Sequence, residues 1–150
     1  RVRADDGSLT YQNLRSGRIW GFDGQLTREG THQIKHRIEW QWQHGEADNG
    51  EFLDDLPPPE VSYTGTWRNG SFSVAFDLGY RFERGNRGPS EIPLGSALIC
   101  AARIQWKPSS SWSVSLAVNN GFDRTYRTSA DENAPLASER TAHLTLHWAP

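Results

Sequence analysis

The chain of 150 residues contains no methionine, a single cysteine and only 35% hydrophobic residues. The lone Cys100 excludes an internal disulfide. No run approaches the roughly eighteen apolar residues of a transmembrane helix, and no signal peptide is visible. The missing initiator methionine indicates a fragment or a processed chain. The net charge of -2 gives no reason to expect a nucleic-acid partner.

The common catalytic and cofactor motifs are absent too. The sequence has no Gly-x-Ser-x-Gly elbow, no P-loop and no dinucleotide fingerprint. His143 and His147 share one face of an expected strand, but four residues of rise separate them by about 13 Å, too far for one metal. Two acidic pairs, Asp54–Asp55 and Asp131–Glu132, fall in polar loops, where solvated charge is the simpler interpretation. We therefore expect no catalytic residue, no metal ligand and no cofactor.

What the chain does contain is aromatic residues and a strict alternation. It has seven Trp, six Phe and four Tyr. From Trp112 to Val118, and again from Ala142 to Trp148, every second residue is apolar and those between are mostly Ser, Thr, Asn or His. A period of two predicts strands with one apolar and one polar face.

The same pattern recurs along the chain and predicts seven strands. They cover residues 18–28, 33–43, 61–67, 72–82, 97–106, 111–123 and 139–149. Short turns near residues 29, 69 and 108 alternate with long polar loops over 44–60, 84–95 and 123–139. A propeller blade would need four short strands per repeat, whereas each repeat here has two long ones. The predicted fold is all-β, an antiparallel up-and-down sheet with its short turns at one end.

Alternation alone does not decide whether the apolar face lines a soluble sandwich or meets lipid. Eleven residues tilted near 45° span about 25 Å, the height of the apolar band of an outer-membrane barrel, whereas sandwich strands are nearer five or six residues long. The apolar face lacks Asp, Glu and Lys, and the tryptophans gather near strand ends, as in the aromatic girdles of membrane barrels. The expected girdle residues are Trp20, Trp40, Trp42, Trp67, Trp106, Trp112 and Trp148. These features favour a transmembrane β-barrel.

The opposite face carries charges in mid-strand. The candidates to face a wet lumen are Arg37, Arg81, Arg103 and Asp77. One interpretation is a path for an anionic ferric chelate. The favoured one is pairing across neighbouring strands with Glu39, Asp77 and Glu83.

Several segments resemble the TonB-dependent outer-membrane receptors. VNNGFDRTY (118–126), a loop, Arg140 and a last aromatic-ended strand resemble the C-terminal end of that family. YQNLRSGRIWGFDGQL (11–26) resembles its Tyr-x-Asn and Gly-x-Glu strand, and DDLPPPEVSY (54–63) its Pro-Pro strand entry. The chain departs from the family pattern with Gly121 for Leu, Asp23 for Glu, Glu139 for Gly, and Ala149-Pro150 after the final aromatic residue.

The resemblance implies that residues 1–150 are the C-terminal segment of a 22-stranded barrel whose plug domain lies outside this chain. It implies a location in the Gram-negative outer membrane, with short turns periplasmic and long loops extracellular. It also implies partners: membrane lipid, an extracellular small ligand such as an iron–siderophore, and the inner-membrane TonB complex acting through the N-terminal part. The function would be energy-coupled uptake rather than catalysis.

Two alternatives stay open at this point. One is a small closed barrel of eight strands, with Ser8 to Leu14 as the extra strand, that serves adhesion or structure. The other is an outer-membrane hydrolase that uses Asp54, Asp55 or His44 in the loops.

Overall fold

The computed structural model describes residues 2–3, 9–10 and 16–149, and the regular secondary structure in this part of the chain is almost entirely β-strand. The strands of the main sheet are β3 (Gly17–Glu29), β4 (Ile34–Ala47), β5 (Glu60–Asn69), β6 (Phe72–Arg81), β7 (Ala97–Trp106), β8 (Trp112–Asn119) and β9 (Thr141–Trp148). A short 3-10 turn, η1 (Thr31–Gln33), joins β3 to β4. Two further strands, β1 (Val2–Arg3) and β2 (Leu9–Thr10), pair with each other.

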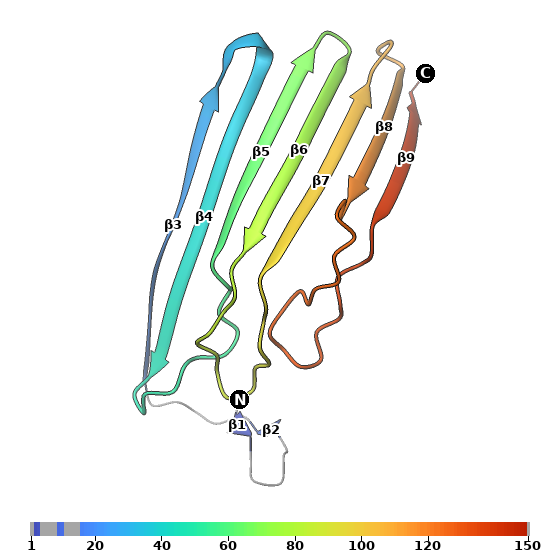
Figure 1. The fold of residues 1–150 in the computed structure, drawn as a ribbon. Coiled ribbons are helices and arrows are strands. Elements are labelled where there is room, and N and C mark those ends of the chain that lie inside the picture. Colours follow the sequence, from blue (N-terminus) through green and yellow to red (C-terminus); the bar gives the residue numbers. More distant parts are fainter. Residues whose placement is uncertain (1, 4–8, 11–15, 150) are drawn as a thin grey trace.

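The seven long strands form one sheet in the order of the sequence, and each pair of neighbours is antiparallel. Figure 1 shows them side by side in a single layer, with the short turns and the end of β9 at one rim and the long loops at the other. The all-β, up-and-down architecture predicted from the alternation is confirmed. Within the described residues the sheet is open, because β3 and β9 each have a partner on one side only.

The short turns use residues suited to tight geometry. Asn69 pairs with Phe72, so the β5–β6 turn consists of Gly70 and Ser71. Of these two only Gly70 has a positive φ, +56°, as expected for a type II′ hairpin with glycine at its first central position. At the β3–β4 turn, His32 and Gln33 both take positive φ and the amide of Gly30 donates to the carbonyl of Ile34 at 2.7 Å.

The strand boundaries agree with the predicted ranges to within two residues except at β4 and β8. The strand predicted over 111–123 ends at Asn119, because the chain bends after that residue. We expected β4 to end at residue 43, but it continues to Ala47 and pairs with β3 throughout. Beyond Gln41, β4 has no partner in β5. Residues of the following loop form hydrogen bonds with the free edge of β4 instead. The amide of Leu53 donates to the carbonyl of Gly45 at 3.0 Å, and the amide of Ala47 donates to Glu51 at 2.8 Å. The Gly and Asp residues of the region predict a loop, yet these backbone bonds keep the chain extended.

Among the described residues no second layer covers the sheet. The accessible surface of the chain is 10647 Å², whereas a globular protein of 16.9 kDa exposes about 7,700 Å². Among the described residues no large side chain is fully buried. This arrangement contradicts the soluble two-layer sandwich for the described part of the chain, because a sandwich would bury one face of each sheet.

The eighth strand required by the small closed barrel is not found in the main sheet. Leu9–Thr10, inside the segment considered for it, pairs with β1, and the remainder of Ser8 to Leu14 lies outside the described residues. No helix in the described ranges is long and apolar enough to cross a membrane.

Candidate functional site: the polar face and the long-loop rim

The strand register separates the side chains into two faces across all seven strands. In the middle of the sheet Gly65, Phe76, Ala102, Val118 and Ala142 form one row of paired residues on the apolar face. Most large apolar side chains of this face are exposed, including Phe76, Ile104 and Leu144. The apolar face is therefore a broad hydrophobic surface that no other described residues cover.

Aromatic rings concentrate near the two rims of the apolar face. At the short-turn rim, Trp106 stacks on Phe72 with ring centroids 5.9 Å apart, and Trp112 lies 6.0 Å from Trp148. Trp67 lies in the same region, opposite Ile34 and Val74. These are the positions predicted for one girdle.

At the long-loop rim the rings form a cluster around Trp42. Its ring centroid lies 4.8 Å from that of Trp20, 5.6 Å from Phe22 and 6.2 Å from His44, which in turn meets Phe52. Trp40, also predicted for this girdle, lies at an interior position of the longer β4, opposite Gly24 and Val61.

The extension of β4 also corrects the prediction that the apolar face lacks acids. Glu46 and Arg18 lie opposite each other on this face at the long-loop end, where His44 Nε2 lies 2.9 Å from Glu46. These charges stand beyond the aromatic cluster and away from the middle of the sheet.

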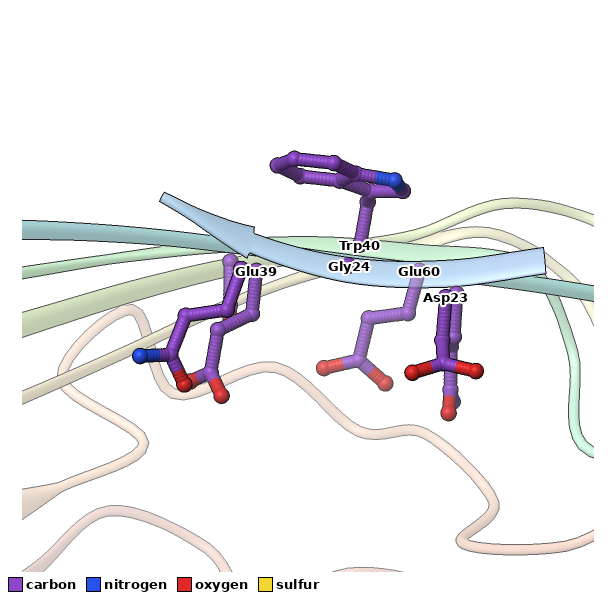
Figure 2. Close-up of a pocket in the computed structure, with 8 residues that line it drawn as sticks. Asp23, Gly24, Glu39, Trp40 and Glu60 are labelled. Atoms are coloured by element: carbon purple, nitrogen blue, oxygen red, sulfur yellow. The ribbon is translucent and has the colours of Figure 1, made fainter. Parts of the chain in front are cut away.

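The polar face holds an acidic pocket between β3, β4 and β5. It has a volume of about 390 Å³ and is lined by the carboxylates of Asp23, Glu39 and Glu60 together with neutral polar groups. In Figure 2 these carboxylates lie on one side of the sheet, and the Trp40 ring lies on the other, over Gly24. A cluster of three carboxylates attracts cations, while its neighbour Arg37 is bonded to Glu39.

The four residues predicted to face the lumen all lie on the polar face, but their pairing differs from the prediction. Arg37 bonds Glu39 along its own strand rather than across strands. Asp77 accepts a 2.7 Å hydrogen bond from the Thr64 hydroxyl of β5, its register partner. Arg103 is exposed and lies opposite alanines on both sides, so it has no ion pair within the described residues. The predicted cross-strand ion pairs of Arg37, Arg81 and Arg103 are therefore wrong.

Arg81 is covered by the long loop between β8 and β9. It is only 5% exposed, although it lies directly opposite Glu60 in the register. Its guanidinium donates to the carbonyl of Arg127 at 2.7 Å and lies 5.3 Å from the centre of the Tyr126 ring. Its second terminal nitrogen donates to the carbonyl of Gly95 at 3.4 Å, so the arginine holds residues 126–127 and residue 95 against the polar side of the sheet.

The first two long loops are joined through one buried ion pair. Arg84 Nη1 lies 2.9 Å from Glu91 Oε1, and the two side chains are 9% and 3% exposed. Arg84 also donates to the carbonyls of Leu53 and Leu56, while Glu91 accepts from the amides of Asp55 and Gly88. The third loop joins this assembly through a 2.8 Å bond from the amide of Ile92 to the carbonyl of Ala130.

The segment resembling the family's Asn-Leu-Phe-Asp pattern forms a tight bend after β8. Asn120 has φ 48° and is 6% exposed, and its amide group donates to the carbonyls of Arg124 and Ser138. A side chain at Gly121 would place its Cβ 2.8 Å from Cys100 Sγ, too close for ordinary contact. The departure to glycine at this position is explained by the buried thiol beneath it.

The residues of the hydrolase alternative are not brought together. Asp54 accepts from the hydroxyl and amide of Ser90, whereas the His44 ring contacts Trp20, Trp42 and Phe52 on the apolar face. In the described ranges no group of three metal-ligating residues is close enough to hold a metal ion.

The sheet is similar to parts of known protein structures. No family model matches the sequence, and no curated protein matches it. Among solved structures, a chain described as "Copper transporter OprC" superposes with a TM-score of 0.78 at 14% identity, over 88% of this chain and 23% of that one. A structure titled "Structure of the FpvAI-pyocin S2 complex" gives 0.70 at 16% identity, over 88% of this chain and 19% of that one. The sheet has the fold of a segment of a TonB-dependent receptor barrel.

The chain spans about a quarter or less of the length of these receptor chains. The likeness to TonB-dependent receptors in fold agrees with the resemblance seen in the sequence motifs. Sequence reasoning missed Arg84, Glu91 and Asn120, because a loop residue gives no signal of a distant partner. The acids Asp23, Glu39 and Glu60 could have been grouped, since alternation assigns each to the polar face and the register brings them together.

Proposed function

We propose that this chain is the C-terminal wall segment of an outer-membrane TonB-dependent receptor and that the whole protein takes up a scarce metal chelate. The observation that carries the proposal is the single antiparallel sheet, one face of which is apolar, ringed at both rims by aromatic residues and free of any protein cover among the described residues. Such a surface fits lipid, because the hydrocarbon chains of lipid form no hydrogen bonds with side chains.

In this proposal the polar face lines the lumen and the long loops lie outside the cell. The ligand first meets a surface formed by all three long loops. The Arg84–Glu91 pair and the bond between Ile92 and Ala130 hold these loops together. Arg103, which has no ion pair among the described residues, offers its positive charge to an anionic chelate, and the carboxylates of Asp23, Glu39 and Glu60 make the neighbouring part of the polar face negative. The inner-membrane TonB complex acts through a plug outside this chain, and no residue here performs covalent chemistry.

The lipid contact is tested with spin labels at adjacent residues that face opposite ways. Labels at Leu78 and Ile104 report the apolar face, and labels at Asp77 and Arg103 report the polar face of the same strands. Cys100 is first replaced by serine so that each label has one attachment site. We expect oxygen to relax the first pair more strongly, and a water-soluble nickel complex the second. Equal accessibility of all four to the nickel complex would contradict the proposal.

The cargo is tested by uptake in cells that carry or lack the complete protein. Radiolabelled ferric siderophore and radiolabelled copper are supplied separately, since one matched chain is named as a copper transporter. We expect protein-dependent accumulation that stops when an uncoupler collapses the inner-membrane proton gradient. Accumulation of neither metal, or accumulation unaffected by the uncoupler, would contradict an energy-coupled metal carrier.

A further inference from the structure

A second pocket lies on the apolar face, at the short-turn rim, and its chemistry differs from that of the surrounding surface. It has a volume of about 560 Å³, and most of its wall is apolar, from Leu26, Ile34 and Ile38. Two nitrogen-bearing side chains, Arg28 and His36, also line it, and no carboxylate does. The pocket therefore combines an apolar wall with positively charged or hydrogen-bond-donating groups.

The two nitrogen-bearing residues are held next to each other by the sheet. Arg28 of β3 lies directly opposite His36 of β4, so their Cβ atoms are about 5 Å apart. Arg28 is exposed and forms no ion pair with any described residue. A guanidinium without a carboxylate partner, at the edge of an apolar surface, favours an anion supplied from outside the chain.

His36 interrupts the apolar alternation of β4, and its orientation is fixed. Its Nδ1 lies 2.9 Å from the hydroxyl of Tyr63, whose ring lies over Gly65. Its Nε2 points toward the turn, where a Cβ on Gly30 would lie only 3.1 Å away. With the Tyr63 hydroxyl donating to Nδ1, the ring hydrogen resides on Nε2, which then acts as a donor into the pocket.

We propose that this pocket binds one phospholipid molecule, with its phosphate between Arg28 and His36 Nε2 and an acyl chain along Leu26 and Ile38. The charge complementarity commits the site to an anionic amphiphile: the donors fit a phosphate diester, and the apolar wall fits a hydrocarbon chain. The position at the rim places the phosphate at the level of headgroups and the chain in the apolar band. The inference rests on the proposed function in one respect, that the apolar face meets a membrane.

The test is native mass spectrometry of the whole protein in detergent, titrated with phosphatidylglycerol. R28Q removes the charge, H36Q disturbs the second donor, and Y63F removes the hydroxyl that orients it. R18Q is the matched control, because Arg18 lies on the same strand and face at the opposite rim. We expect about tenfold weaker binding for R28Q and several-fold weaker binding for H36Q and Y63F, with R18Q unchanged.

Three results would overturn the lipid site. R28Q and H36Q could bind as tightly as R18Q; diacylglycerol, which lacks the phosphate, could bind as well as phosphatidylglycerol; or inorganic phosphate could displace the lipid at equal concentration. If R28Q does not fold, R28K and H36Q are compared with R18Q: R28K should bind as tightly as R18Q, and H36Q several-fold more weakly. Failure of the proposed function is distinguishable, because the protein would then stay in solution without detergent.

Discussion

The guanidinium of Arg84 is bonded to the carboxylate of Glu91 at 2.9 Å, and this pair, together with the bonds from Ser90 to Asp54, fixes two long loops to each other. Arg84 contacts the carbonyls of residues 53 and 56, and Glu91 accepts the amide of Asp55, so each partner holds the loop between β4 and β5. Both side chains are almost fully buried. Removal of one partner leaves a buried charge without compensation, a loss that typically costs about 3–5 kcal/mol.

The Arg84→Ala variant should therefore release both loops while the sheet stays intact. Hydrogen exchange at the amides of Asp55 and Gly88, which donate to Glu91, should accelerate by at least a hundredfold. Arg87→Ala is the control, since Arg87 is an exposed residue of the same loop. Equal exchange in the two variants would show that the ion pair does not hold the loops.

Asn120 should prove essential for the bend after β8, whereas its neighbour should not. In Asn120→Ala the carbonyls of Arg124 and Ser138 lose their donor, and alanine is disfavoured at φ 48°. We expect about 2–3 kcal/mol of local destabilisation, measured as faster exchange of the Arg124 amide. Asn119→Ala removes only a 3.4 Å side-chain contact and serves as the reference. Asn120→Gly restores the backbone freedom alone and should recover part of the loss.

Gly24 should tolerate no side chain, because the Trp40 ring occupies the space above it. A Cβ at this position would lie 2.4 Å from Trp40 Cζ2. Gly24→Ala should displace the indole, shift the tryptophan emission and cost about 1–3 kcal/mol in unfolding experiments. Gly79→Ala is matched, since its Cβ would meet only Glu60 Oε1 at 3.6 Å. An unchanged spectrum in Gly24→Ala would contradict the packing of Trp40 on the strand.

Two neighbouring alanines of β7 lie on opposite faces of the sheet, one on the apolar face and one on the polar face. Ala102 pairs with Phe76 and Val118 on the apolar side, and Ala101 pairs with Asp77 and Asn119 on the polar side. Ala102→Arg should lower the folding free energy in bilayers by about 2–4 kcal/mol, and Ala101→Arg should change it little. The measurement is urea-induced unfolding from vesicles. Equal effects in both variants would mean that the two faces meet the same solvent.

The sheet could be predicted from the sequence because alternation is a local signal. Each apolar residue of β6, from Phe72 to Tyr80, reports its face through its immediate neighbours, and the short turns then set the order of the strands. The extension of β4 could not be predicted, since it depends on backbone bonds from residues 51 and 53 rather than on the side chains of 44–47.

The charged residues were assigned to the correct face but not to their partners. Asp77 is satisfied by Thr64, whose hydroxyl carries no charge and gives no electrostatic signal in the sequence. Arg81 donates to the carbonyl of Arg127, more than forty positions further along the chain, rather than to the carboxylate of an acid predicted for it. The girdle assignment of Trp20, Trp40, Trp42, Trp67, Trp106, Trp112 and Trp148 stays a prediction, because it concerns a solvent rather than a contact.

The end of β4 that extends beyond β5 has its free main-chain edge occupied by loop residues at the long-loop rim. There the carbonyl of Gly45 accepts a hydrogen bond from the amide of Leu53, and the amide of Ala47 donates one to the carbonyl of Glu51. A passing peptide cannot add itself there as another strand, so this corner resists strand exchange and aggregation. A molecule that docks at this edge of β4 therefore contacts aromatic and charged side chains rather than free main-chain groups.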